Sequence, residues 1–330
     1  MQISEVLRLI KNRAFTLIEA IFVIVVLSFV LIGGFQIVSK IYKRNYIAKK
    51  TAEFEFVSEE VLNQLAQFLY YRVDKSLIGY DKNLSFKYMS YITQDENYTI
   101  LEWIGYLNDA MVERNLSTFV DLGDCNSTTF LAKDFNKNFI TAVLQNKYDT
   151  IDPNAVKNLS AIIFAGELDE GEMGADDDNN SFGWHGNGHN LVYDIESINS
   201  SGDDANITLK TAPSHIYSKF YLVDSAYALA LKKDLNKILL PQCTDLDLSK
   251  LDDNTLLLFY NYRPWVQHIG IGETFCADNR GVPKGNVTVL AENVASFRVK
   301  KAGNHLVILL QMQKQKGDIN ITISKQKVIY

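Results

Sequence analysis

The chain has 330 residues, which is enough for one large domain or two small ones beyond a membrane anchor. Its formal net charge of -6 gives it no overall basic field, which argues against tight, charge-driven binding of nucleic acid by the whole molecule. Its three cysteines lack the Cys-x-x-Cys spacing of zinc sites and thioredoxin-like redox sites.

A long apolar stretch runs from Phe15 to Val38, and Glu19 is its only ionisable residue. Its 24 residues would rise about 36 Å as an α-helix, which is enough to cross a hydrocarbon core of about 30 Å with some tilt. An ionisable group in lipid costs several kcal/mol unless it finds a partner. We therefore expect a membrane-spanning helix in which Glu19 has a function; the alternative is an ordinary anchor that tolerates one acid.

Residues 1–14 precede this stretch as a short leader with basic residues, and the leader ends in Ala14. A secretory signal peptide has its small-residue cleavage site after the apolar region, whereas here the junction between Ala14 and Phe15 lies before it. The apolar stretch would therefore remain after processing. Basic residues follow it as well, so charge alone does not orient the helix; they are Lys40, Lys43, Arg44, Lys49 and Lys50.

An amphipathic pattern continues beyond Ser39 and predicts that the helix extends to about residue 78. No proline occurs before Pro153, so nothing in the sequence forces an earlier break. Gly33 and Gly34 are the weakest point, because each costs about 1 kcal/mol relative to alanine within a helix. The apolar positions at helical spacing are Ile47, Phe54, Val57, Val61, Leu65, Phe68 and Leu69.

The rest of the chain has the patterns of an α+β domain. Helices are expected at Ile100–Arg114 and Phe135–Lys147, and loops in the polar segments Glu167–Asn190 and Ser197–Asn206. Short apolar or alternating runs from Ala161 onward predict strands; they are residues 161–166, 191–197, 206–211, 219–233, 255–265, 287–301, 305–314 and 319–330. The last three runs are separated by turn residues and predict a terminal antiparallel meander.

The order of residues at the N-terminus resembles the class III signal of type IV pilins and type II secretion pseudopilins. The resemblance is carried by Lys11, Arg13, Ala14, Phe15 and Glu19, followed by the apolar stretch. In this family a membrane-bound prepilin peptidase cuts before Phe-Thr-Leu-Ile-Glu and the new N-terminal amine is methylated. The resemblance implies cleavage between Ala14 and Phe15, N-methylation of Phe15, and a place for Glu19 at the fifth residue of the mature chain.

This chain departs from the family at two positions, since Ala14 replaces the usual glycine and Gln36 stands where a helix proline is frequent. The resemblance implies a cytoplasmic N-terminus, one span of the inner membrane and a periplasmic domain. It also implies that Glu19 pairs with the N-terminal amine of Phe15 on a neighbouring subunit, which happens only when helices stack in register. The implied parts are a leader at 1–14, a transmembrane half-helix at 15–38, an amphipathic half-helix at 39–78 and a pilin-like α+β domain with antiparallel β-sheet at 79–330.

Residues 289–301 and the two strands after them are similar to the C-terminal end of J-type pseudopilins and W-type minor pilins. These larger minor subunits are thought to cap or prime a filament, although the subunit at the extreme tip usually lacks the glutamate. We therefore expect a minor subunit of a type II secretion, type IV pilus or competence filament. Its partners would be other pilins or pseudopilins, the prepilin peptidase and the inner membrane, with DNA involved only indirectly in a competence system.

The alternative function is that of a single-span membrane protein whose periplasmic domain binds calcium or a glycan without assembling. Asp176, Asp178 and Asn180 offer oxygen ligands for Ca2+, and further acids precede them. The segment departs from an EF-hand loop at Ser181 and Asn187, so a solvated acidic loop is the favoured interpretation. The acids upstream are Glu167, Asp169, Glu170 and Glu172.

His185 and His189 are four residues apart, a spacing that brings two imidazoles together only on a helix. Gly186 and Gly188 disfavour such a helix, so we do not expect a metal site or another cofactor there. The sequence has no G-x-S-x-G, Walker A, H-E-x-x-H or G-x-G-x-x-G motif, and we expect a protein that is not an enzyme.

In an oxidising compartment two of the three cysteines would form a disulfide. We favour Cys243 with Cys276, because both flank one strand-like run. The alternative is that Cys125, Cys243 and Cys276 are three buried free thiols.

Several Asn-x-Ser/Thr triplets have Asp or Glu two residues before the asparagine, which resembles the extended acceptor of bacterial periplasmic oligosaccharyltransferases. The alternative is chance, because surface loops are rich in Asn, Asp and Ser. The asparagines are Asn83, Asn97, Asn115, Asn126, Asn206 and Asn320.

Overall fold

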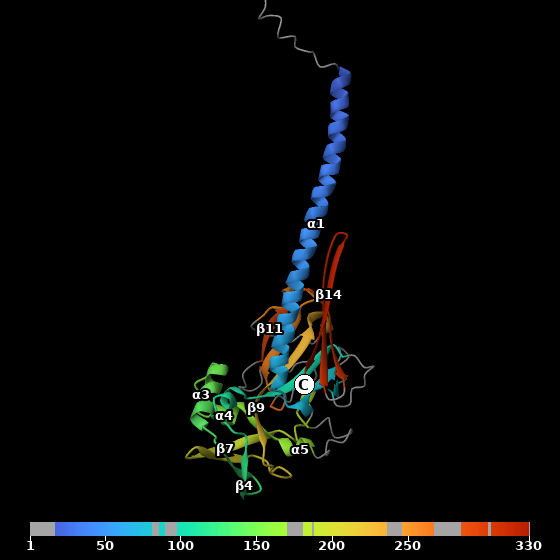
Figure 1. The fold of residues 1–330 in the computed structure, drawn as a ribbon. Helices are drawn as coiled ribbons and strands as arrows, with labels where there is room; N and C mark the ends of the chain where they lie inside the picture. The colour runs from blue at the N-terminus through green and yellow to red at the C-terminus, as the bar shows by residue number, and fades with distance from the viewer. Residues whose placement is uncertain are drawn as a thin grey trace, which may run out of the picture. The chain divides into compact units, whose positions relative to one another are not determined.

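The structure is a computed structural model that describes residues 17–80, 86–89, 98–169, 181–186, 188–235, 246–266, 285–302 and 305–329. The chain divides into two compact units, residues 1–53 and residues 54–330. Helix α1 (Leu17–Tyr70) belongs in part to each of them. The expected α+β class with a long apolar N-terminal helix and antiparallel sheet is confirmed (Figure 1).

The described part of the first unit is helical throughout, and no residue from Leu17 to Glu53 is buried. The helix continues through Gly33 and Gly34 without a break, so their low helix propensity does not interrupt it. Helix α1 ends at Tyr70, earlier than expected from the pattern. The chain turns there because Arg72 donates through Nη1 to the carbonyl oxygen of Leu69, a C-terminal cap of the last turn.

In the second unit, the last turns of α1 bury one face against the sheets. The buried residues recur at i, i+4, i+7, i+8, i+11 and i+15, which is the stripe expected of a helix that packs on one side; they are Phe54, Ser58, Val61, Leu62, Leu65 and Leu69. Each fully buried Leu or Val contributes about 1.5–3 kcal/mol to the hydrophobic stabilisation. Phe68, which we expected on this face, is 36% exposed.

The larger sheet has eleven strands, in the main order β2-β1-β3-β9-β6-β7-β8-β5-β4, with β10 beside β9 and β11 beside β10. Its centre is β9 (Phe220–Leu231), which pairs along one edge with β3 (Ile100–Tyr106). Along the other edge β9 pairs first with β6 (Ala161–Phe164) and then with β10 (Leu256–Tyr262). The remaining strands are β1 (Ile78–Tyr80), β2 (Phe86–Tyr88), β4 (Val120–Cys125), β5 (Thr129–Ala132), β7 (Tyr193–Ser201), β8 (Asp204–Leu209) and β11 (Asn286–Ala291).

Two expectations for the second unit are wrong. The segment Ile100–Arg114 is not one helix but strand β3 followed by the short helix α2 (Asp109–Val112). The polar segment Ser197–Asn206 is not a loop but most of a hairpin, in which β7 and β8 meet at a tight turn with Gly202 at φ +66°.

The helix expected at Phe135–Lys147 is confirmed as α3 (Lys137–Lys147). The side chain of Asn136 caps it by accepting a hydrogen bond from the backbone N–H of Phe139. Two further short helices are α4 (Ala155–Leu159) and α5 (Ala165–Asp169). Helices α3 and α4 supply apolar residues to the core that β5, β6, β7 and β8 share.

The terminal meander is confirmed as a separate three-stranded antiparallel sheet of β12 (Val294–Ala302), β13 (His305–Lys316) and β14 (Ile319–Ile329). The run predicted at 287–301 is divided at Asn293, whose φ of 60° ends β11 in the larger sheet and begins β12 in the smaller one. Strand β14 lies beside the last turns of α1, and an ion pair joins the two elements. In it, Lys325 Nζ is 2.9 Å from Glu59 Oε2. That contact lowers the pKa of Glu59.

Candidate functional site

The N-terminal part of α1 carries the sequence features that suggested a function. Among the described residues, α1 is the one helix that is long and apolar enough to cross a membrane. Apolar side chains project from every side of it, with Leu17 82%, Phe22 68% and Phe35 73% exposed. A helix that is apolar all round is stable in lipid or among other helices rather than in water.

Glu19 lies in the first turn of α1 and is exposed. An acid near a helix N-terminus interacts favourably with the partial positive charge there. Farther along the helix, a Cβ placed on Gly33 or Gly34 would meet no atom within 4 Å, so the backbone is open to close approach by another helix. Ala14 and Phe15, the residues of the expected processing site, lie outside the described residues.

The other predicted ligand and disulfide positions also fall outside the described part of the chain: Cys243, Cys276, Asp176, Asp178 and Asn180. Cys125 is a free thiol but is exposed, so the alternative of three buried thiols is wrong for this residue. Glu167, upstream of the acidic segment, is buried and accepts hydrogen bonds from Tyr193 OH at 2.7 Å and Ser214 Oγ at 3.1 Å. Its carboxylate thus belongs to the core rather than to the acidic loop.

The two histidines lie in different surroundings. His185 is buried, has φ 53° and stacks on the ring of Phe86 with centroids 5.2 Å apart. Its Nε2 is 3.6 Å from Glu102 Oε1, and Tyr262 OH donates to the other oxygen of Glu102 at 3.0 Å. His189 instead places Nδ1 3.2 Å from the carbonyl oxygen of Val192.

Burial lowers the pKa of His185 to about 4, so the imidazole is neutral in the folded protein at pH 7. In the unfolded chain it titrates near 6.5. Below pH 6.5 the unfolded state therefore binds more protons, and the stability that comes from the neutral imidazole is lost as pH falls from 6.5 to about 4.

We expect His185 to reduce the free energy of unfolding by about 2 kcal/mol between pH 7 and pH 5. Urea denaturation of the detergent-solubilised chain, followed by tryptophan fluorescence, measures this slope. His185→Asn is the matched control, because asparagine tolerates a positive φ and does not titrate. If the variant keeps the same pH slope as the parent protein, the titrating group is not His185.

A buried charge cluster that the sequence analysis did not identify joins α3 to β9. Lys147 Nζ is 2.6 Å from Asp224 Oδ2, and Tyr148 OH donates to the backbone carbonyl of Asp224 at 2.7 Å. The guanidinium of Arg263 lies 5.7 Å from the centre of the Tyr148 ring. Burial acts to lower the pKa of Lys147, but the attraction of Asp224 outweighs it and the pKa is raised. The signal that could have found this cluster is Asp224 itself, a single acid in an otherwise apolar strand.

A groove of about 730 Å³ opens beside this cluster. Its lining combines aromatic rings with carboxamides and two charged residues. Aromatic rings pack against the apolar faces of small polar ligands, and carboxamides and charged groups form hydrogen bonds with ligand hydroxyls. The lining residues include Gln64, Gln67, Phe68, Tyr71, Tyr106, Asn108, Asp109, Asn146, Lys147 and Tyr227. Among the described residues, no group of three or more His, Cys, Asp or Glu side chains could hold a metal ion.

Comparison with known proteins gives no relative. No protein-family model matches the chain, and no curated protein and no solved structure is similar to it at a significant level. The arguments for its function therefore come from its own residues.

The asparagines of the extended Asn-x-Ser/Thr triplets occupy different environments. Asn126 is exposed in the loop between β4 and β5, and Asn320 is exposed near the start of β14. Asn115 is half-buried after α2, and Asn206 is half-buried within β8. Asn83 and Asn97 lie outside the described residues.

Proposed function

We propose that the chain is a minor pilin or pseudopilin, a structural subunit that assembles through its N-terminal helix into a type II secretion, type IV pilus or competence filament. The observation that carries the proposal is the order of Arg13, Ala14, Phe15 and Glu19 at the start of a long apolar helix. That helix continues to Tyr70, where its buried stripe packs on an antiparallel sheet. A helix of this kind can anchor the subunit in a bilayer before assembly and pack against other helices afterwards.

The proposal gives Glu19 a physical role. A carboxylate in lipid is costly, and it stays ionised only next to a cationic partner. In the proposed filament the partner is the N-terminal amine of Phe15 on a neighbouring subunit. Because a buried ion pair with one partner missing is strongly destabilising, the pair favours one stacking register over its neighbours.

Processing of the N-terminus is the direct test. We expect mass spectrometry of the membrane-extracted protein to find N-methyl-Phe15 as the first residue, with residues 1–14 removed. Expression in a host that lacks a prepilin peptidase should give the intact chain and serves as the control. A chain that keeps residues 1–14, or that begins with an unmethylated Phe15, in the presence of the peptidase would contradict the proposal.

A second candidate function is supported by the groove beside Lys147. A single-span protein with a periplasmic ligand-binding domain would need such a cavity, and its aromatic and carboxamide lining suits a glycan. Asn146→Ala and Tyr106→Ala would reduce saccharide binding in this case. Neither substitution would affect N-terminal processing, so the two functions are distinguishable.

A further inference from the structure

Acidic residues precede the Asn-x-Ser/Thr triplets of this chain far more often than its composition explains. Ten asparagines have Ser or Thr two residues later: Asn83, Asn97, Asn115, Asn126, Asn158, Asn179, Asn199, Asn206, Asn286 and Asn320. All but Asn158, Asn199 and Asn286 also have Asp or Glu two residues earlier. Since 39 of the 330 residues are Asp or Glu, about one such acid is expected at ten positions. The excess makes chance a poor explanation and raises the question of which sites are accessible.

Asn126 has both an accessible amide and an accessible acid. It lies in the exposed loop between β4 and β5, outside any strand. Its Oδ1 accepts hydrogen bonds from the backbone N–H groups of Thr128 at 3.0 Å and Thr129 at 2.8 Å. Its Nδ2 donates to no residue in the described ranges. Asp124, two residues earlier, is exposed and makes no ion pair or hydrogen bond within those ranges.

This geometry leaves the amide nitrogen available. Both hydrogen bonds go to Oδ1, so they fix the orientation of the side-chain amide without engaging Nδ2 within the described residues. The turn also places Thr128, the residue of the triplet with the hydroxyl group, close to the Asn126 side chain.

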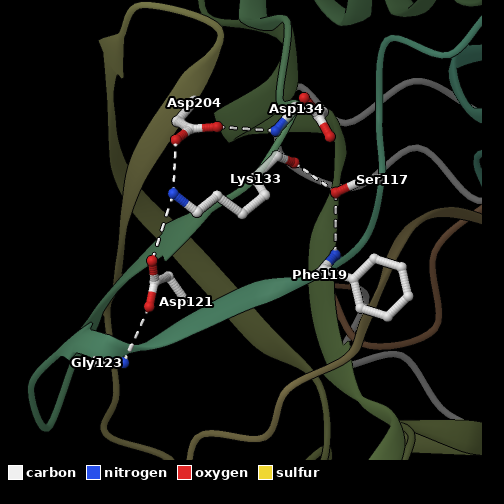
Figure 2. A network of polar contacts seen from close by, with 7 residues as sticks. All are labelled: Ser117, Phe119, Asp121, Gly123, Lys133, Asp134 and Asp204. Atoms are coloured by element: carbon white, nitrogen blue, oxygen red, sulfur yellow. Dashed lines mark hydrogen bonds and ion pairs between the residues drawn. The ribbon is translucent and has the colours of Figure 1, made fainter.

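Asn206 has the same sequence pattern as Asn126, but neither its amide nor its acid is as accessible. It lies in the middle of a three-stranded arrangement, opposite Leu131 on β5 and Asn199 on β7. Its acid, Asp204, accepts from Lys133 Nζ at 3.0 Å and from the backbone N–H of Asp134 at 3.0 Å (Figure 2). Both the backbone and the carboxylate of this triplet are therefore engaged in the fold.

Lys133 also contacts Asp121, at 3.3 Å, so it bridges β4 and β8 in the network of Figure 2. The contact with Asp204 lowers the pKa of that carboxyl and holds it ionised within the bridge. An enzyme that must bind the acid of the Asn206 triplet would have to break this bridge, whereas Asp124 needs no such rearrangement.

The two other described triplets are intermediate. Asn115 donates through Nδ2 to the carbonyl oxygen of Glu113 at 3.0 Å, so its nucleophilic nitrogen is occupied. Asn320 is exposed but lies on β14 opposite Gln315, and its Oδ1 accepts from Gln313. In a strand, residues i and i+2 are about 6.6 Å apart, so Thr322 cannot fold back onto Asn320.

We propose that Asn126 is an acceptor site for an N-linked glycan, transferred by an oligosaccharyltransferase that requires an acid two residues before the asparagine. Nδ2 of Asn126 attacks the anomeric carbon of a polyprenyl-diphosphate-linked oligosaccharide. The bond from that carbon to the diphosphate oxygen breaks, the polyprenyl diphosphate leaves with the electron pair, and Nδ2 loses one proton to a base of the transferase. In the cell the reaction rests on the periplasmic placement proposed above.

The test uses the full chain, purified in detergent from a host without the glycosylation system. It is incubated with a bacterial oligosaccharyltransferase of this specificity and its lipid-linked oligosaccharide, and the tryptic peptides are analysed by mass spectrometry. On the folded chain we expect Asn126 to be occupied about tenfold more than Asn206, with Asn320 between them. On the urea-unfolded chain, diluted into the reaction, Asn206 should become modified as well.

Two variants separate the acid from the asparagine. Asn126→Gln should remove the glycan from that peptide alone, and Asp124→Asn should lower the occupancy of Asn126 about tenfold without affecting Asn320. Both changes lie in an exposed loop, and an unchanged melting temperature establishes that the fold is retained. Equal occupancy of Asn126 and Asn206 on the folded chain, or no effect of Asp124→Asn, would overturn the proposal. Because the reaction is carried out in solution, its failure is independent of filament assembly.

Discussion

Replacing Glu19 by alanine should leave the protein in the membrane but remove most of its crosslinking to the neighbouring helices of the proposed filament. The substitution makes the apolar segment more apolar, so insertion does not suffer. In the proposed filament the substitution removes the carboxylate that pairs with the amine of Phe15 on the adjacent subunit. Removing one partner of a buried charge pair costs about 2–5 kcal/mol, which corresponds to at least about a thirtyfold loss of the stacked state.

The measurement is the yield of cysteine crosslinks between α1 helices in membranes, compared at equal amounts of inserted protein. Ser28→Ala is the matched control, because Ser28 lies on the same helix and its Oγ donates to the carbonyl oxygen of Ile24 within that helix. Glu19→Gln separates charge from hydrogen bonding and should behave like the alanine variant. Crosslinking that is unchanged by Glu19→Ala would count against a role in register.

The long helix and the terminal meander were predictable because their information is local. Each repeats one period over many residues, with apolar residues at helical spacing up to Leu69 and alternation along β13 and β14. Local signals also suffice for α3, where Asn136 provides the cap and the apolar positions lie on one face.

Strand β3 was mistaken for a helix because it is buried on both faces. A strand that is buried on both faces shows no apolar/polar alternation. Its six apolar or small residues, interrupted only by Glu102, fit a buried helix equally well. Tertiary structure also decides where the strand predicted at 287–301 is divided into β11 and β12. Asn293 adopts a positive φ there, which asparagine tolerates, and it sends β11 and β12 into different sheets.

The candidate sites also differ in whether local sequence or tertiary structure reveals them. Glu19 and the Asn-x-Ser/Thr triplets are visible as sequence, but only the structure distinguishes Asn126 in its open loop from Asn206 in a paired strand. The cluster around Asp224 is visible only in part. Its acid interrupts an apolar strand, whereas the lysine that neutralises it is Lys147, which comes from a helix far away in sequence.

Asp224→Asn should lower the free energy of unfolding by about 2–3 kcal/mol. The substitution leaves Lys147 without its carboxylate in a site where burial disfavours the charged amine, and it weakens the bond from Tyr148 OH to the side chain. Breaking a fully buried pair costs about 3–5 kcal/mol. We expect a smaller loss of unfolding free energy here, because the Lys147 side chain is 24% exposed, although that of Asp224 is only 2% exposed. Urea denaturation of the detergent-solubilised chain at pH 7 measures the loss.

Asp121→Asn is the matched control for this prediction. Asp121 also pairs with a lysine, at 3.3 Å, but its side chain is 41% exposed and Lys133 keeps a second carboxylate in Asp204. Exposed pairs of this kind contribute at most about 1 kcal/mol. If burial sets the cost, the double variant Lys147→Gln with Asp224→Asn should be more stable than the sum of the single losses, since neither site then holds an unpaired charge. Equal losses for Asp224→Asn and Asp121→Asn would show that solvent reaches Lys147 and that the cluster is not a buried pair.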